Sequence, residues 1–290
     1  MASAPVQKKH VEGKAVGQSL LSRILLYAVL ILFGLFFLLP LLWMFVTAIK
    51  PQAEWLSTNW IPRNPTLGNF TAILNNPSLP MIRWFLNSVV VATVFTTLVV
   101  ALDALAAYAY ARMEFPGRNL LFSVLLATLV MPGIIFLVPN YLTIANLNGL
   151  NTYWGIIAPG LAGVFGVFFL RQFFKSIPRE LEEAALIDGA NIWTTFFRVV
   201  LPLSVPALST LGIITYLASW NDFLWPLLIV GNDPTKQTLP VGLAKLQGAY
   251  TFNYGQLMAG AVIAALPVLI LYLLLQRYIV QSVASTGLKG

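Results

Sequence analysis

One polar stretch between two apolar segments has the residue types expected for docking with another protein. It covers Phe173–Arg198, reads FFKSIPRELEEAALIDGANIWTTFFR, and holds four of the ten acidic residues. Pro178 suits a first helical turn, and the glutamates after it place negative charge where the helix dipole favours it. Gly189 is expected to end this helix in the left-handed conformation, and Asn191 to cap a second helix. The pattern predicts a helix, a glycine elbow and a second helix that bind a partner; an ordinary surface loop is the alternative.

A second group of residues combines aromatic rings with amide, hydroxyl and carboxylate groups in apolar segments. Ionisable residues in such segments are candidates for function, and aromatic faces beside hydrogen-bonding groups suit the hydroxyls of a sugar. We interpret six residues as candidates for lining a translocation path: Asn87, Tyr216, Ser219, Trp220, Asn221 and Asp222. Alternatively, Asp222 caps a broken helix. Asp103 also lies in an apolar segment, where we expect a buried hydrogen bond between helices.

The sequence lacks the residues that several other kinds of functional site require. The sequence has no cysteine, which excludes a disulfide, a thiolate metal site and a cysteine nucleophile. Its single histidine, His10, lies in a polar N-terminal segment and is expected to be solvated. No G-x-x-x-x-G-K-[ST] loop occurs, so the chain has no phosphate-binding loop of that kind. We expect no catalytic residue, metal or cofactor in this chain.

The segments that position these residues are strongly apolar. The chain is 58% hydrophobic and 9% charged, with a mean hydropathy of +0.81, whereas soluble globular domains carry about 25% charged residues. No charged residue lies between Arg118 and Arg171, a segment that as one helix would far exceed a bilayer core of ~30 Å. The composition excludes a soluble enzyme and a disordered protein. It predicts an all-α polytopic membrane protein.

Hydropathy predicts six transmembrane helices. Several contain proline, which removes a backbone donor and bends or breaks a helix. The expected spans are about Ile24–Ile49, Phe85–Tyr110, Leu120–Leu142, Trp154–Leu170, Val199–Val230 and Leu257–Val280. The expected organisation is a polar tail at 1–22, a first helix at 23–50, an outer loop at 51–84, a five-helix core at 85–281 and a tail at 282–290.

The distribution of Lys and Arg predicts the orientation of these spans. Twelve of the 17 basic residues fall on one side of the predicted spans: Lys8, Lys9, Lys14, Arg23, Arg112, Arg118, Arg171, Lys175, Arg179, Arg198, Arg277 and Lys289. The positive-inside rule places this side, with both termini, in the cytoplasm. Membrane orientation therefore accounts for the net charge of +7, and no nucleic-acid partner is expected.

The spacing within the polar stretch resembles a known family. Glu183-Ala184-Ala185, Gly189 and Leu201-Pro202 are similar to the EAA motif in permease subunits of bacterial ABC importers. The segment Trp220-Asn221-Asp222-Phe223-Leu224-Trp225-Pro226 resembles a W-N-[DE]-F-x-x-P segment in permeases of carbohydrate importers. From about Trp60 to the C-terminus, the chain is similar to the smaller permease of maltose-type uptake systems.

The resemblance implies a division of labour between subunits. Such a chain pairs with a second permease and two ATPase subunits, which hold ATP and magnesium, in a bacterial or archaeal inner membrane. A solute-binding protein outside the membrane delivers a carbohydrate. Glu183, Ala184, Ala185, Gly189, Leu201 and Pro202 would belong to a coupling helix at about 178–196 that contacts the ATPases. An outer segment would contact the binding protein: Thr238, Leu239, Pro240, Val241, Gly242 and Leu243.

Two alternatives stay open at this point. The chain could serve an ABC importer for a solute other than a sugar, such as glycerol phosphate. It could also be a secondary transporter, although such proteins work without an EAA segment and usually show inverted repeats.

Overall fold

The computed structural model describes residues 20–247 and 253–287, and these contain helices but no β-strand. The first elements are α1 (Leu20–Ala48), η1 (Gln52–Glu54), α2 (Gly68–Leu74), α3 (Met81–Arg112), α4 (Arg118–Thr128), η2 (Gly133–Phe136), α5 (Leu137–Asn146), α6 (Tyr153–Ile157) and η3 (Ala158–Gly160). There follow α7 (Val164–Ser176), α8 (Arg179–Ile187), α9 (Ile192–Thr195), the π-helical turn η4 (Phe196–Val200), α10 (Leu201–Leu203), α11 (Val205–Trp220), α12 (Leu224–Val230), α13 (Leu239–Ala244), η5 (Lys245–Gln247) and α14 (Tyr254–Gly287). The all-α prediction is confirmed.

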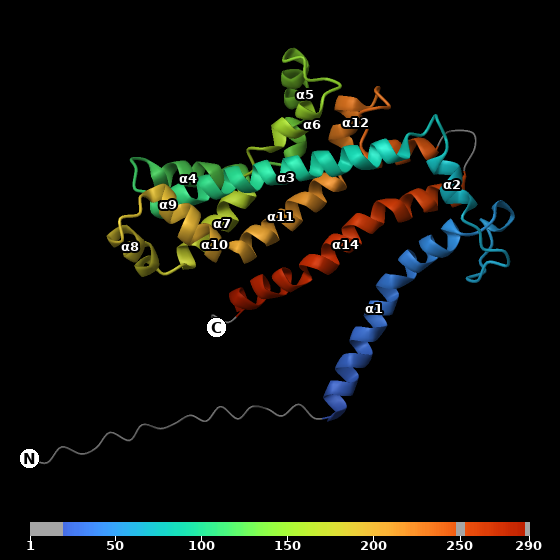
Figure 1. Cartoon of the computed structure of the whole chain (residues 1–290), viewed down its shortest axis with the longest axis horizontal. Helices are drawn as coiled ribbons and strands as arrows, with labels where there is room; N and C mark the ends of the chain where they lie inside the picture. Colours follow the sequence, from blue (N-terminus) through green and yellow to red (C-terminus); the bar gives the residue numbers. More distant parts are fainter. Residues whose placement is uncertain (1–19, 248–252, 288–290) are drawn as a thin grey trace, which may run out of the picture.

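The long helix α3 is the centre of this arrangement, with α7 and α11 packed along it (Figure 1). Its sequence contains neither glycine nor proline, so nothing in it interrupts the helix. Small side chains such as Ala104 and Ala107 are buried, and they let Leu170 and Phe174 of α7 approach closely. On the other side of α11 lies α14, which also contacts α1.

Three helices are long and apolar enough to cross a membrane unbroken, namely α1, α3 and α14. Three further pairs pass the same test if each pair is one bent span. The bends are 94° between α4 and η2–α5, 51° between α6–η3 and α7, and 76° between 192–203 and α11. By length and composition, the described residues thus offer three to six candidate spans, as expected for a polytopic membrane protein.

Prolines mark the bends but do not always produce one. Pro132 precedes η2, Pro159 lies in η3 and Pro206 lies in the first turn of α11, each at a bend. In contrast, Pro40 and Pro267 lie inside α1 and α14, which continue through them. A proline in an apolar segment therefore does not by itself predict a bend.

The expected fifth span, 199–230, is divided differently in the structure. Its helix α11 ends at Trp220, residues 221–223 are non-helical, and α12 then begins at Leu224. In Figure 1, α12 lies on the same side of α3 as α5 and α6, and it contacts both of them. The single predicted span is therefore interrupted twice, by the 76° bend before α11 and by the break at 221–223.

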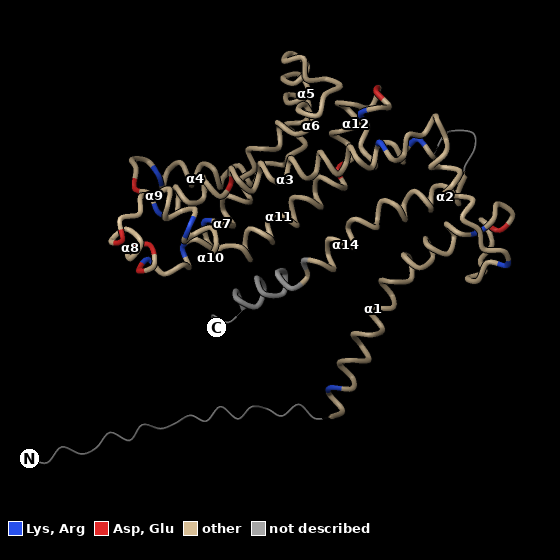
Figure 2. The backbone as a smooth tube through the Cα atoms, viewed as in Figure 1, with Lys and Arg blue, Asp and Glu red and all other residues tan. Residues whose placement is uncertain are grey.

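Charged residues gather at the two ends of the helix bundle, and the middle is nearly free of them (Figure 2). Most of α1 is exposed, with burial confined to residues near its end such as Thr47 and Ala48. Of the expected tails, residues 1–19 and 288–290 lie outside the described residues, and His10 with them; residues 20–22 begin α1.

Candidate functional site

The predicted helix–elbow–helix is confirmed at the C-terminal end of α3. Helix α8 begins directly after Pro178 and carries Glu180 and Glu182 in its first turn. Gly189 has a φ of 86° with open space around it, so it supplies the left-handed residue that ends the helix. The side chain of Asn191 accepts a hydrogen bond of 2.8 Å from the Thr194 N–H, which caps α9.

The outer face of α8 and α9 is open to a partner. Glu183 and Ala184 are exposed, and Ala185 is half-buried. Large apolar side chains surround them: Ile187 is 86% exposed and Trp193 is 62% exposed. Of the remaining motif residues, Leu201 packs partly against the α3–α7 core, while Pro202 is exposed in α10. This face has the small and apolar character of a docking surface.

The inner face of α8 is held by a residue pair that we did not single out from the sequence. Arg112 Nε lies 2.6 Å from Glu182 Oε1, and their side chains are only 9% and 11% exposed. Arg112 Nη2 also donates a 2.8 Å hydrogen bond to the carbonyl of Ile177, just before α8. The adjacent glutamates were the available signal, because neighbours on a helix point about 100° apart and two in a row can therefore have different surroundings.

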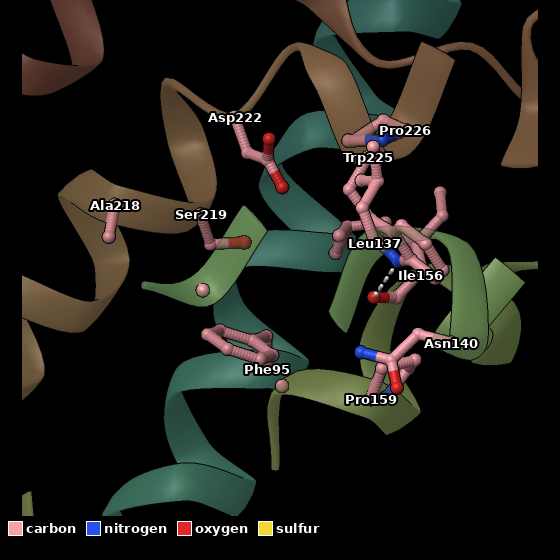
Figure 3. Close-up of a pocket in the computed structure, with 13 residues that line it drawn as sticks. Phe95, Leu137, Asn140, Ile156, Pro159, Ala218, Ser219, Asp222, Trp225 and Pro226 are labelled. Carbon is pink, nitrogen blue, oxygen red and sulfur yellow. Dashed lines mark hydrogen bonds between the residues drawn. The ribbon is translucent and has the colours of Figure 1, made fainter. Parts of the chain in front are cut away.

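A cavity of about 320 Å³ lies between α3, α6, α11 and α12 (Figure 3). Ser219 and Asp222 line one side of it, and Asn140 points into it from α5. The rings of Phe95 and Trp225 supply aromatic surface, with the Trp225 indole fixed by 3.2 Å contacts to the carbonyls of Gly155 and Ile156. Its lining thus combines hydrogen-bonding groups with aromatic faces.

Four of the six path candidates lie away from this lining. Trp220 is buried, stacks on Tyr216 with ring centroids 6.0 Å apart, and donates to the Ala264 carbonyl of α14. Asn221 is exposed and bonds back to the Leu217 carbonyl of its own helix. Asn87 lies near the N-terminal end of α3. Of the six candidates, therefore, only Ser219 and Asp222 line the cavity.

Asp222 also faces the start of α12. Its carboxylate lies near the backbone N–H groups of Phe223, Leu224 and Trp225, but α12 has no side-chain cap with hydrogen-bond geometry. In Figure 3 the carboxylate points toward the cavity.

The expectation for Asp103 is wrong for the described residues. Asp103 is 3% exposed, but its Oδ2 has no hydrogen-bond partner there. Gly166 of α7 faces this oxygen so closely that a Cβ would overlap it. The absence of a side chain at Gly166 thus makes room for the carboxyl group, and no donor among the described residues bonds to its Oδ2.

The N-terminal end of α3 holds the loop before α13 through hydrogen bonds to its backbone, and one of them comes from the charged Arg83, whose Nε donates to the Thr235 carbonyl at 3.0 Å. Asn87 Nδ2 donates to the carbonyls of Thr235 and Gln237, at 3.0 and 2.8 Å. The same side chain accepts a 2.8 Å hydrogen bond from the Tyr153 hydroxyl. Ser88 Oγ accepts from the Leu239 N–H at 2.8 Å. Asn87 is therefore part of a clamp on this loop.

The segment 238–243 is largely packed inside the chain. Thr238, Leu239 and Val241 are at most 3% exposed, and Pro240 and Leu243 are half-buried. Gly242 lies against the ring of Trp84, where a Cβ would overlap the indole. These six residues position the loop before them, and the exposed surface here comes from neighbours such as Asn232, Pro234, Thr235, Ala244 and Lys245.

The exposed loop carries one ordered acidic group. Asp233 accepts hydrogen bonds from the Thr235 hydroxyl and N–H, at 2.6 and 2.9 Å, and these bonds lower the pKa of its carboxyl group. Lys236 lies 3.4 Å from the same carboxylate and donates to the Asn151 carbonyl.

Residues 104–285 match the family of binding-protein-dependent transport system inner membrane components. The chain belongs to this family. The matched residues include the helix–elbow–helix and the cavity residues of α11 and α12. As a family member, the chain is a multi-pass permease component of an ABC transport system.

Curated relatives of this family cover most of the chain. It is 37% identical to the arabinooligosaccharides transport system permease of Halalkalibacterium halodurans, over 87% of this chain and 91% of that one. It is 37% identical to the diacetylchitobiose uptake system permease of Streptomyces coelicolor, over 89% and 86%. It is 34% identical to the trehalose/maltose transport system permease of Thermococcus litoralis, over 94% and 99%.

A solved bacterial ABC transporter involved in the import of alginate shares the fold. Its matching chain aligns with a TM-score of 0.76 and 23% identity, over 90% of this chain and 98% of that one.

Proposed function

We propose that this permease imports a sugar or oligosaccharide, forms half of the translocation path, and couples that path to separate ATPase subunits by alternating access. The observation that carries the coupling role is the exposed Glu183-Ala184-Ala185 segment on α8, at the end of the long helix α3. The named substrates of three relatives, arabinooligosaccharides, diacetylchitobiose and trehalose/maltose, support a carbohydrate.

The other subunits follow from this role. Two ATPase subunits would hold ATP and magnesium and receive α8 with the elbow at Gly189. A second permease would complete the path, and lipids would surround the exposed apolar helices, α1 among them. A solute-binding protein would dock at the far end of the molecule. A bacterial alginate ABC transporter of similar fold has been solved in complex with a periplasmic protein that holds an alginate pentasaccharide, which supports this kind of partner.

The cavity at Ser219 and Asp222 is the proposed contact between this chain and the passing sugar. Carboxylate, hydroxyl and amide groups can replace water around sugar hydroxyls, and the rings of Phe95 and Trp225 can cover an apolar sugar face. The asymmetry of Lys and Arg supports an orientation in which α8 and both termini are cytoplasmic.

Reconstitution of the chain with its second permease, ATPase subunits and binding protein tests this function. The vesicles are oriented so that the ATPase subunits face the interior. They should accumulate labelled sugar only when they enclose ATP and the liganded binding protein is present outside. We expect Glu183→Ala to weaken retention of the ATPase subunits, because it removes an exposed polar contact. Glu180→Ala in the exposed first turn of α8 is the matched control. Uptake that runs on an ion gradient without ATP would contradict the proposal.

The path is tested by two substitutions in adjacent residues. Asp222→Ala should lower the uptake rate several-fold in a normally assembled complex, because it removes a carboxylate from the cavity lining. Asn221→Ala should leave uptake unchanged, since that amide bonds only to its own helix. Equal effects of the two substitutions would show that the cavity is not where the sugar passes.

A further inference from the structure

The contact between α8 and α3 consists of a small set of side-chain interactions. The backbone of α8 lies mainly against α9 and η4 rather than along α3. Arg112, in the last turn of α3, bridges this gap by pairing with Glu182 and bonding to the Ile177 carbonyl. The N-terminal end of α8 is therefore tied to α3 at two points by one guanidinium group.

The surroundings of this contact largely bury it. Tyr108, one turn before Arg112, lies beside the Glu182 carboxylate and is 8% exposed. Its ring packs against Phe196 and Phe174, with centroids 4.8 and 6.5 Å away. Because water has little access to the pair, its attraction is screened less than that of a surface pair. Arg112 Nε and Glu182 Oε1 have no hydrogen-bond partner among the described residues, so charge and proximity hold the pair.

The helix α3 then leads from this contact to the cavity. Val91 and Phe95 on α3 line the cavity wall, and no glycine or proline interrupts the helix between Phe95 and Arg112. In contrast, the two covalent routes from α8 toward the cavity each cross a bend. The route through α7 and α6 is bent by 51°, and the route through α9 and α11 is bent by 76°. Bent junctions can absorb a displacement that a straight helix passes on.

We propose that the Arg112–Glu182 ion pair is the link that transmits movement of α8 to α3, and through α3 to the cavity wall. This proposal rests on the proposed coupling function. Glu183 and Glu182 then have different roles: Glu183 faces the ATPase, and Glu182 is a positioning residue that makes α8 and α3 move together.

A thiol cross-link can replace the ion pair, because the chain contains no cysteine of its own. The test uses Arg112→Cys/Glu182→Cys in a complex whose partner subunits lack cysteine. A short bifunctional thiol reagent joins the two positions, and a monofunctional reagent is the control. The readouts are ATPase subunits retained per permease, stimulation of ATP hydrolysis by liganded binding protein, and sugar transported per ATP hydrolysed.

Before cross-linking, we expect the double variant to retain its ATPase subunits but to lose about tenfold in sugar transported per ATP, within the range of allosteric coupling. Stimulation by the binding protein should fall in parallel. The bifunctional reagent should restore both, and the monofunctional reagent neither. Arg179→Cys/Glu180→Cys, two exposed residues at the start of α8, should remain coupled throughout.

Three results would overturn the proposal. Normal coupling before cross-linking would show that the pair is dispensable. Loss of the ATPase subunits would show that it only supports the docking surface. Uncoupling that persists after a verified cross-link would show that the link between helices is not what matters. Failure of the unsubstituted complex to transport sugar would instead contradict the proposed function, so the two failures are distinct.

Discussion

Each end of α3 contacts a segment that the sequence predicts to bind a partner, and the two segments differ in their exposure. At its C-terminal end, the Glu183-Ala184-Ala185 segment faces outward, and a buried ion pair holds its helix from behind. At its N-terminal end, segment 238–243 is itself buried, against Trp84 and beside Ser88. One of the two predicted contact segments is thus exposed, and the other is packed inside the chain. Exposure distinguishes the two, and sequence alone does not report it.

The interactions that hold the two segments against α3 also differ. The C-terminal end uses a charged pair, whose attraction depends on both partners remaining in place. The N-terminal end uses hydrogen bonds to backbone groups rather than a side-chain ion pair: Arg83 and Asn87 donate to carbonyls of the loop, and Ser88 accepts from the Leu239 N–H. A charged pair between separate helices suits a junction that moves as a unit. A set of backbone hydrogen bonds suits a loop that is held in one conformation.

The largest contrast between the ends should appear when a tryptophan is removed from each. Trp84→Ala should lower the free energy of unfolding by about 3–5 kcal/mol, because it empties a fully buried site. Trp193→Ala removes a ring that is 62% exposed and should leave the stability of the isolated chain nearly unchanged. Thermal unfolding in detergent measures both variants. Similar destabilisation by the two would contradict the division into a packing end and a docking end.

A smaller and more selective effect is expected at the elbow. Gly189→Asp places a charged side chain in the left-handed region, which costs at most about 1–2 kcal/mol locally because aspartate tolerates this conformation better than most residues. The helices should still form, but sugar uptake and stimulation of ATP hydrolysis by the binding protein should fall sharply.

Gly117 provides the matched control for this substitution. It has a φ of 79° and equally open surroundings, but it lies between α3 and α4, away from α8. Gly117→Asp carries the same backbone strain and should keep coupling intact. Loss of coupling in both variants would attribute the effect to strain rather than to the elbow.

The smallest effect is expected for the exposed ion pair near α13. Asp233→Asn removes a contact of 3.4 Å to Lys236, and such exposed pairs contribute little to stability. Hydrogen bonds from Thr235 lower the pKa of the Asp233 carboxyl group. The stabilisation that the ionised carboxylate contributes is therefore complete above the ordinary carboxyl pKa, and it is lost only as the pH falls through the lowered pKa. The unfolding temperatures of the native protein and the variant should therefore differ only slightly, and by the same amount at pH 7 and at pH 6. A clear difference there would show that this loop is fastened by charge, as the other end is.

The sequence by itself determined the features that depend on local order. The all-α membrane class follows from composition, and the helix, elbow and cap around Gly189 and Asn191 follow from turn and capping chemistry. These preferences act within a few residues, so a single stretch of sequence contains them. The family follows from the same stretch, because its motif spacing is a local property.

Tertiary structure alone decided which polar residues meet. Arg112 lies 65 residues from the Ile177 carbonyl that it binds, and Asn87 lies 150 residues from the Gln237 carbonyl. Periodicity cannot show which of Glu182 and Glu183 faces the protein, because either face of α8 is compatible with a helix. The break at 221–223 likewise places Asp222 at the cavity and turns Trp220 toward α14. The physical reason is that these outcomes depend on the packing of separate helices, and the residues of any one segment do not specify the surface that it will meet.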